Sequence, residues 1–440
     1  MNEPVLRNPI RPEEGLRFLS TLGASGIRMG LDRIALALKA IGNPERSYRI
    51  LHVAGTNGKG STCAFAASCL GAQGYRVGLY TSPHLVRVNE RIQVNGEEIS
   101  DARLGERVLE VLSRYPEAQQ APYPLTFFEF STVVALWHFS VERVDVAVLE
   151  TGLGGRLDAT TAAEPTVTAI TPIAFDHMDY LGHSLPAIAR EKAGILKPGI
   201  PAAISRQPPE AMDVLQQVAK GLGAPIYIEG RDFEIGIAAG GQLQYRGMHS
   251  SLNDLRLSLR GGHQSQNAAI ALASLELLAR ELPVSDGAIR SGLAHTQWPG
   301  RLEELGSHPA VLLDGAHNPL GVEILLTALR ELYPGRRIHL VFGVLADKDY
   351  HAMIEKLFPK CASASLAPLS SPRSLAPESY CAEARNFCPR TSAYSSVAEA
   401  LQAARANALP DDLVVCTGSL FLVGAVRELV VPPRPLAASP

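Results

Sequence analysis

A short glycine-rich segment combines one lysine with hydroxyl side chains, a set of residues that can hold a row of phosphates. It consists of Gly55, Thr56, Asn57, Gly58, Lys59, Gly60 and Ser61. Glycines let backbone N–H groups turn toward phosphate oxygens, and the lysine can reach the β- and γ-phosphates. The spacing departs from GxxxxGK[ST], because Val53 stands where that pattern has its first glycine and Gly60 follows the lysine. A ligand-free glycine turn is the alternative, but a strand before the segment and a helix after it favour a phosphate loop.

Polar side chains also follow three of the apolar, strand-like runs. Ser82, Glu150 and the pair Asp176–His177 each come at or just after the end of such a run. Ligands of open α/β sheets bind beyond the carboxyl ends of the strands, and an acid there can hold magnesium. Glu150 is therefore expected to act in a site rather than to be a solvated strand end. Magnesium prefers oxygen, so a hydrogen-bonded turn residue stays open for His177. For Lys192 the residues alone favour an exposed helical lysine.

The elements that must position these side chains alternate between strands and helices. The pattern predicts strands at Tyr48–Ala54, Arg76–Tyr80, Val144–Leu149 and Thr166–Thr171, with a helix at Ser61–Gln73. Strands that are apolar at consecutive positions suit burial on both faces. The alternation therefore predicts a doubly wound, mainly parallel P-loop sheet with helices on both faces.

The rest of the chain divides into three parts. Phe233–Gly262 has short alternating segments and predicts a small antiparallel sheet, and Asn267–Leu282 predicts a helix. After a break at His295–Arg301 a second strand and helix alternation begins, which predicts a C-terminal Rossmann-like α/β domain. Within it, Ser363–Pro377 is read as a connection. The predicted domains are residues 1–297 and 298–432, followed by a disordered tail at 433–440.

Composition excludes several classes of protein. The 440 residues are 46% hydrophobic and 19% charged, so the chain can bury large cores and is not disordered. With 41 Lys and Arg against 44 Asp and Glu, the net charge gives no general attraction for nucleic acid or an anionic membrane surface, and a local basic patch stays open. No run is long enough for a membrane span, and the N-terminus lacks the apolar region of a secretory signal. Six cysteines without a CxxC indicate a reduced, cytoplasmic chain without a zinc site.

The candidate residues belong to longer stretches that resemble the bacterial folylpolyglutamate synthases, including members that are also dihydrofolate synthases, within the Mur ligase superfamily. The stretches are HVAGTNGKGST (52–62), YTSPHLVRVNERI (80–92), LTFFEF (125–130), VLETGLGGRLDAT (148–160), DHMDYLG (176–182), REKAGI (190–195), HQSQNAAIAL (263–272), WPGRLE (298–303), LLDGAHNP (312–319) and GVLADKDY (343–350). One stretch could be chance, whereas so many in order across two domains are specific.

The resemblance implies a nucleotide and metal site with ATP as co-substrate. The phosphate loop would hold the triphosphate through Lys59, while Asn267, Arg301 and Asp314 would contact ATP. Of two magnesium sites, Ser82 and Glu150 would form one, and Glu150 with His177 the other. Lys192 matches a family lysine that is carbamylated and lies near the second metal.

The resemblance also implies two sites for the joined substrates. His317, counted with Lys59 and Lys192 as catalytic, would lie near the transferred phosphate and the incoming glutamate, and Ser419 near that glutamate. The pterin site would comprise Met29, Gly30, Leu31, Asp32, Thr126, Phe128, Leu157 and Ala159. Met29 stands where the family often has another apolar residue.

The implied activity is ATP-dependent addition of L-glutamate to folates and to dihydropteroate through an acyl phosphate. The alternatives are a Mur-type cell-wall amino-acid ligase and a folylpolyglutamate synthase that lacks dihydrofolate synthase activity. A P-loop kinase or switch NTPase would not need the second α/β domain, and a scaffold would leave the phosphate and metal residues idle. Only 54 residues precede Gly55, which is short for the nucleotide-sugar domain of cell-wall ligases. A cytoplasmic monomer is expected, without nucleic acid or membrane partners.

Overall fold

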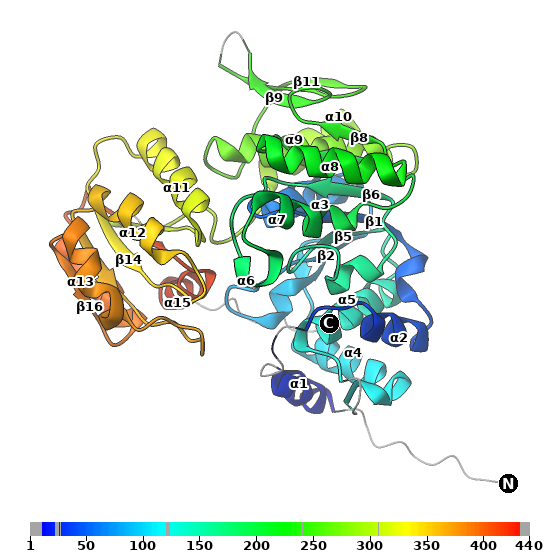
Figure 1. Cartoon of the computed structure of the whole chain (residues 1–440), viewed down its shortest axis with the longest axis horizontal. Coiled ribbons are helices and arrows are strands. Elements are labelled where there is room, and N and C mark those ends of the chain that lie inside the picture. Colours follow the sequence, from blue (N-terminus) through cyan, green and yellow to red (C-terminus); the bar gives the residue numbers. More distant parts are fainter. Residues whose placement is uncertain are drawn as a thin grey trace.

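The computed structural model describes residues 11–22, 26, 28–119, 124–238, 241–306 and 308–431 (Figure 1). Two α/β domains lie side by side, and a small antiparallel sheet projects from the larger one. The fold class expected from the sequence is confirmed. The division after residue 297 stays a prediction, and the predicted disordered tail at 433–440 lies outside the described residues.

The larger domain is built on an eight-stranded sheet in the order β4-β3-β2-β5-β1-β6-β7-β8. The bounds are β1 Arg49–Ala54, β2 Val77–Tyr80, β3 Ile92–Val94, β4 Glu97–Glu98, β5 Val146–Glu150, β6 Val167–Ile170, β7 Ala202–Ile204 and β8 Ile226–Ile228. Strands β2, β5, β1, β6, β7 and β8 are parallel to their neighbours in this order. Strands β3 and β4 extend the edge beside β2 and pair antiparallel. The carboxyl ends of the parallel strands therefore share one edge, where ligands of such sheets bind.

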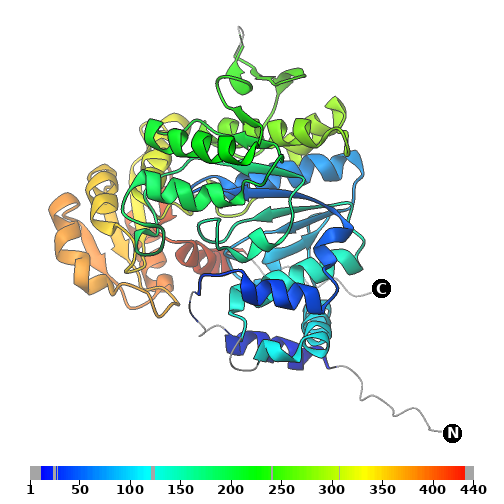
Figure 2. The same cartoon turned by 45° about the vertical axis from the view of Figure 1, so that its right-hand side comes forward.

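Helices cover both faces of this sheet (Figure 2). On one face α3 (Lys59–Gln73) packs against the strands together with α9 (His263–Leu278) and α10 (Asp286–His295). On the other face lie α5 (Phe127–Val141), α7 (Leu185–Lys192) and α8 (Pro209–Leu222). The remaining helices of this domain are α1 Pro12–Thr21, α2 Asp32–Ala40, α4 Asp101–Arg114 and α6 Met178–Leu181. Successive residues of the central strands face opposite cores, which explains their nearly continuous apolar runs.

The small antiparallel sheet lies over α9. It has the order β11-β10-β9, with bounds β9 Glu234–Ile237, β10 Leu243–Arg246 and β11 Ser251–Leu255. Tyr245, Leu252 and Leu255 are buried in the same core cluster as the residues of α9. The prediction of an antiparallel sheet here is confirmed. The predicted helix over Asn267–Leu282 is shifted, because α9 starts at His263 and ends at Leu278.

The C-terminal domain has a six-stranded sheet in the order β12-β13-β17-β14-β15-β16, in which only β12 runs antiparallel. The bounds are β12 Glu303–Leu305, β13 Ala310–Leu313, β14 Ile338–Phe342, β15 Ser363–Leu366, β16 Thr391–Ala393 and β17 Leu413–Thr417. Its helices are α11 Pro319–Leu332, α12 Tyr350–Leu357, α13 Pro377–Phe387, α14 Val397–Asn407 and α15 Leu420–Val430. The first three cover one face, and α14 and α15 cover the other.

One sequence prediction in this domain is wrong. Ser363–Pro377 is not a connection throughout, because Ser363–Leu366 forms β15 between β14 and β16. All four residues of β15 are buried although two of them are serines. The hydroxyl of Ser363 contacts His339 Nδ1 at 2.8 Å, so a buried polar partner replaces the apolar pattern expected of an inner strand.

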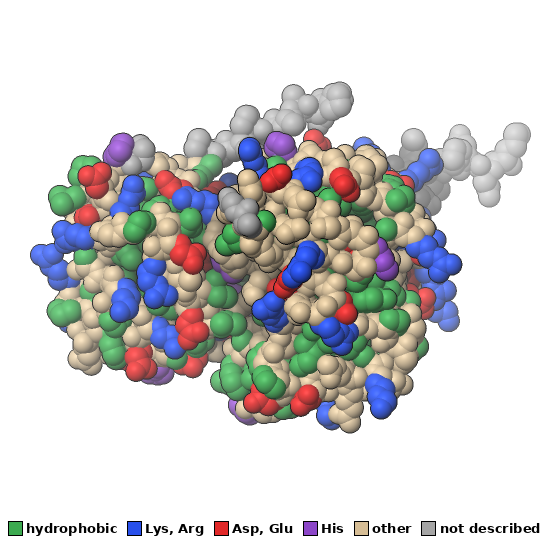
Figure 3. All heavy atoms as spheres, turned by 90° about the horizontal axis from the view of Figure 1, so that it is seen from above, with side chains coloured by type: hydrophobic (Ala, Val, Ile, Leu, Met, Phe, Trp, Pro, Cys, Tyr) green, Lys and Arg blue, Asp and Glu red, His purple; other side chains and the backbone are tan. Residues whose placement is uncertain are grey.

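The outer surface is mixed in charge. Seen from above, the two domains lie side by side with a groove between them, and acidic and basic side chains are interspersed on this face (Figure 3). Among the helices of the described ranges, none has both the length and the apolar character needed to cross a bilayer.

Candidate active site

A cavity of about 160 Å³ lies between the two α/β domains at the carboxyl ends of their strands. From the larger domain it is lined by the whole phosphate loop together with Ser82, Glu150, His177, Lys192 and Asn267. From the linker and the C-terminal domain it is lined by Arg301, Asp314 and His317. The structure therefore brings together every residue that the sequence analysis assigned to ATP, to metal or to catalysis.

The phosphate loop, Gly55–Ser61, joins β1 to α3 in the expected order. Gly58 precedes α3 with a φ of 89°, and a Cβ atom there would lie 2.2 Å from Asn267 Oδ1. Glycine suits this position because it adopts the left-handed backbone conformation without strain and has no Cβ atom to clash with Asn267. Lys59 Nζ donates a hydrogen bond of 3.0 Å to the carbonyl oxygen of Thr56. A bound triphosphate would offer this ammonium a charged acceptor instead.

Lys192 lies beneath the phosphate loop and is only 4% exposed. Its Nζ donates a hydrogen bond of 2.7 Å to the carbonyl oxygen of Gly55. Burial, reinforced by the charge of Lys59, lowers the pKa of Lys192 to about 7. The expectation of an exposed helical lysine, drawn from the residues alone, is therefore wrong.

Glu150 ends β5 inside the cavity, and its side chain is almost fully buried. The backbone N–H of Ser82 donates to Glu150 Oε2 at 3.1 Å. Burial raises the pKa of Glu150, and the nearby charge of Lys59 opposes the shift. Magnesium is usually held by one or two carboxylates plus substrate phosphates, so this carboxylate and the Ser82 hydroxyl fit one such ion.

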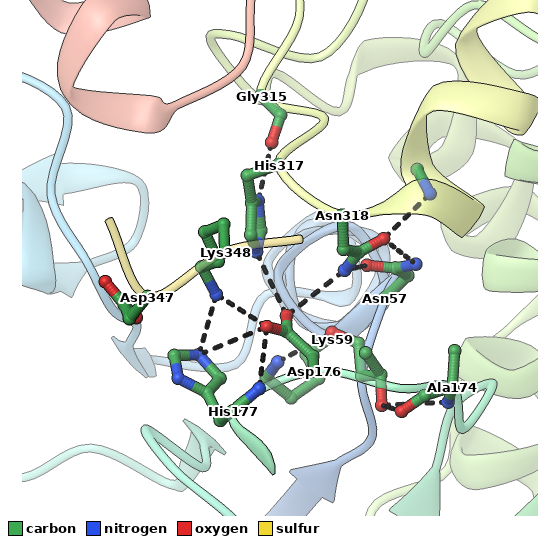
Figure 4. Close-up of polar contacts among 12 residues, drawn as sticks. Asn57, Lys59, Ala174, Asp176, His177, Gly315, His317, Asn318, Asp347 and Lys348 are labelled. Carbon is green, nitrogen blue, oxygen red and sulfur yellow. Dashed lines mark hydrogen bonds and ion pairs between the residues drawn. The ribbon is translucent and has the colours of Figure 1, made fainter. Parts of the chain in front are cut away.

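Five side chains meet between the two domains and form what we call the Asp176 cluster: Asn57 of the phosphate loop, Asp176, His317, Asn318 and Lys348 (Figure 4). Lys348 Nζ lies 2.6 Å from Asp176 Oδ1, and His317 Nε2 lies 3.4 Å from Asp176 Oδ2. Burial alone would raise the pKa of Asp176, but contacts with His317 and Lys348 hold it well below its usual range. The carboxylate is therefore ionised and ties the two domains together electrostatically.

His177 stands beside this cluster in a left-handed backbone conformation, with a φ of 50°. Its Nε2 lies 3.3 Å from Lys348 Nζ, and burial with the charge of Lys348 lowers the pKa of His177 to about 4. The imidazole is therefore neutral near pH 7 and accepts from the ammonium. Among the described residues no group of three His, Cys, Asp or Glu side chains could hold a metal. Lys348 Nζ faces His177, and the amine of Lys192 offers no anionic oxygen, so the set expected around a second metal does not fit that ion as it stands.

The residues assigned to the pterin lie outside this cavity but close to one another. Leu31, Phe128 and Ala159 share one apolar cluster, and Phe128 packs against Gly152, which lines the cavity. Thr126 is buried and caps the N-terminus of α5. Met29, Gly30 and Leu157 are half-buried, and Asp32 is exposed at the start of α2. Ser419 is buried at the start of α15 and accepts from Phe421 N–H, whereas its neighbour Leu420 lines the cavity.

Two residues of the Asp176 cluster were not assigned a role from the sequence. Asn318 and Lys348 lie within LLDGAHNP and GVLADKDY, two of the stretches that carry the family resemblance, but the resemblance gave neither residue a role. What identifies these two residues is their contacts in the fold, which join positions as far apart in the sequence as Asn57 and Asn318. Spacing along the chain could not have shown this.

Family models match both α/β domains. Residues 53–275 match the Mur ligase middle domain, and residues 300–420 match the Mur ligase glutamate ligase domain. The chain is similar to a folylpolyglutamate synthase of Lacticaseibacillus casei, with 40% identity over 408 residues that cover 91% of this chain and 94% of that protein. The chain belongs to the folylpolyglutamate synthase/dihydrofolate synthase family of Mur ligases.

Solved structures of this family have the same architecture. The Escherichia coli FolC in complex with DHPP and ADP superposes with a TM-score of 0.87 at 35% identity, over 97% of this chain and 99% of that one. A bifunctional folylpolyglutamate synthase/dihydrofolate synthase with Mn, AMPPNP and L-glutamate bound superposes with a TM-score of 0.84 at 34% identity. That match covers 94% of this chain and 97% of the other.

Proposed function

We propose that this protein is an ATP-dependent ligase that adds L-glutamate to reduced folates and to dihydropteroate. The observation that carries the proposal is the cavity between the domains, where the phosphate loop, the buried Glu150 and the Asp176 cluster converge. Membership of the folylpolyglutamate synthase/dihydrofolate synthase family supports the substrate class, as do the ligands named for its solved structures.

ATP would lie between the domains with its triphosphate on the phosphate loop. The backbone N–H groups at the start of α3 and the ammonium of Lys59 would face the phosphate oxygens. Asn267 on α9, Arg301 in the linker and Asp314 after β13 would hold the rest of the nucleotide. Asp314 accepts hydrogen bonds from the N–H groups of Leu302 and Ala316, so it also fixes the turns beside Arg301 and His317.

Glu150 and Ser82 would hold one magnesium ion together with the phosphates of ATP. A second site would use Glu150 and His177, and it fits a cation only if Lys192 becomes a carbamate. A neutral Lys192 amine would attack the carbon of CO2: the N–C bond forms, one C–O π bond breaks with its electrons moving to oxygen, and the nitrogen releases one proton to solvent. An anionic carbamate then stands where an amine stood. Burial that lowers the pKa of Lys192 to about 7 makes the neutral amine available. When bound, magnesium neutralises charge on the transferring phosphoryl group.

The reaction would pass through an acyl phosphate. A substrate carboxylate oxygen attacks the γ-phosphorus, the bond to the ADP oxygen breaks, and Lys59 offsets charge on the transferring group. The α-amine of glutamate then attacks the acyl carbon, phosphate leaves, and one amine proton is released. His317 is the candidate for receiving that proton or for contacting the phosphate. Closure of the domains would keep water from the acyl phosphate.

The pterin would bind between α2, the start of α5 and the 157–159 segment. Two of these segments, far apart in the sequence, are tied by Arg33, which lies 2.8 Å from Glu129 Oε1 and donates to the Arg28 carbonyl oxygen. Glu129 Oε2 in turn accepts from Thr126 N–H at 2.8 Å. Met29, Gly30 and Leu31 are thereby held near Thr126 and Phe128, while Ser419 and His317 would lie on the glutamate side.

The test is to measure ATP-dependent glutamylation with dihydropteroate in one reaction and tetrahydrofolate in another, each with glutamate and magnesium. Products are weighed for one added glutamyl unit, and phosphate release is followed. Turnover with both acids supports the proposal. Turnover with tetrahydrofolate alone removes the dihydrofolate synthase activity and the pterin assignment at 29–32. Turnover with neither, from protein that binds ATP, contradicts the folate substrate.

Monomeric state and cytoplasmic location stay predictions.

A further inference from the structure

Asn318 uses its whole side-chain amide to join the two domains. Its Nδ2 donates to Asn57 Oδ1 at 3.0 Å and to Asp176 Oδ2 at 3.1 Å. Its Oδ1 accepts from Asn57 Nδ2 at 3.2 Å and from Gly321 N–H at 2.8 Å. The residue is 2% exposed, so these partners, rather than water, satisfy the amide. Three of the four hydrogen bonds cross from the C-terminal domain to the larger domain.

The partners of Asn318 place it between the phosphate loop and the candidate catalytic groups. Asn57 belongs to the phosphate loop, and the N–H groups of Thr56 and Asn57 both face the carbonyl oxygen of Pro172. On the other side, Asn318 follows His317 directly and caps α11 through Gly321 N–H. A displacement of the phosphate loop at Asn57 therefore acts directly on the residue next to His317.

We propose that Asn318 is a positioning residue that couples the phosphate loop to the C-terminal domain and so holds His317 over the reacting phosphate. The ion pair between Lys348 and Asp176 is the second tie of the same junction, and both side chains are less than a tenth exposed. Figure 4 shows Asn318, His317 and Lys348 converging on Asp176 from the C-terminal domain. The catalytic part of this inference rests on the proposed function, whereas the coupling of loop and domain does not.

The test separates this role from simple capping of α11. Asn318→Ser keeps a good helix cap but is too short to reach Asn57 and Asp176. Asn318→Asp also keeps the cap and the size but cannot donate to Asp176. Asn407→Ser, at the exposed end of α14, is the matched control. Hydrogen–deuterium exchange of the ligand-free proteins is followed in peptides that cover 55–60, 174–178 and 319–322.

Exchange in 55–60 and 174–178 is expected to rise about tenfold in Asn318→Ser, because the three interdomain hydrogen bonds are lost. A larger rise is expected in Asn318→Asp, no change in Asn407→Ser, and little change in 319–322 for either Asn318 variant. Unchanged exchange at 55–60, or a change confined to 319–322, overturns the proposal.

A second readout uses the reaction. In Asn318→Ser the ratio of phosphate released to glutamylated product is expected to rise above one, because looser closure admits water to the acyl phosphate. A rate and a ratio that both stay at the wild-type values contradict the positioning of His317. If the wild-type protein glutamylates neither acid, the proposed function fails, and the exchange experiment still decides the coupling.

Discussion

Lys192 Nζ lies 2.7 Å from the carbonyl oxygen of Gly55, so a buried amine at the end of α7 supports the first residue of the phosphate loop. Among the described residues no carboxylate accepts a hydrogen bond from this amine, and burial weakens its hold on the proton. The same amine donates a hydrogen bond to the loop, and in the proposed carbamylation its neutral form would be the nucleophile toward CO2.

Lys192→Arg is expected to lower glutamylation by about a hundredfold or more, because a guanidinium stays charged and cannot form a carbamate. The measurement is kcat with saturating ATP. In the wild-type protein, intact-mass analysis under bicarbonate should show the mass of one added CO2, and that addition should be absent from Lys192→Arg. Full activity of Lys192→Arg would contradict the carbamate.

The pKa of Lys192 also predicts a pH dependence. The pKa lies near 7, below the usual value of 10.5, so the neutral fraction grows as the pH rises through 7. Protein freed of CO2 should therefore regain activity on addition of bicarbonate faster at pH 8 than at pH 6. Equal rates at the two pH values, with dissolved CO2 held constant, would show that deprotonation of this amine is not required.

Gly58→Ala is expected to abolish ADP binding measured by calorimetry. A Cβ atom at Gly58 would meet Asn267 Oδ1 at 2.2 Å, in a backbone conformation with a φ of 89°. Gly74→Ala is the control, because Gly74 has a φ of 100° but nothing within 4 Å. Both variants bear the strain of about 1–2 kcal/mol for a side chain in this conformation. Equal loss of ADP binding in both would mean that strain alone, rather than the contact with Asn267, explains the effect.

Lys59→Met should reduce kcat by about a hundredfold or more, since it removes a charge placed against the transferring phosphoryl group. Lys220→Met, at the exposed end of α8, is the matched control and should leave kcat unchanged. Steady-state phosphate release from ATP at saturating substrate concentrations is the measurement. If both variants turn over like the wild type, the loop is not the triphosphate site.

Arg33→Met is expected to raise KM for dihydropteroate about tenfold while KM for ATP stays within about twofold, because charged hydrogen bonds between the two pterin segments are lost. Arg103→Met breaks an exposed pair with Glu106 on α4 and serves as the control, since such pairs contribute little. A change in KM for ATP as large as that for dihydropteroate would assign Arg33 to general stability instead.

Local chemistry in this chain was readable from the sequence, and contacts across the domains were not. The phosphate loop and the strand ends at Glu150 and Asp176 follow from residue type and order, because a parallel sheet collects such positions at one edge. The burial of Lys192 depends on α7 packing against the loop, which no local pattern shows. Strand β15 was not predicted because two of its four buried residues are serines, which break the apolar pattern of an inner strand. Asn318 was not assigned a role because its partners are distant in the sequence.

The acyl phosphate is tested most directly by following oxygen from the acceptor carboxylate. Dihydropteroate labelled with 18O in its carboxylate is turned over with ATP, magnesium and glutamate, and the released phosphate is weighed. An acyl phosphate requires that one labelled oxygen leave with each phosphate, so one 18O per phosphate is expected. Glutamylated product accompanied by unlabelled phosphate would contradict the acyl phosphate and with it the role given to the phosphate loop.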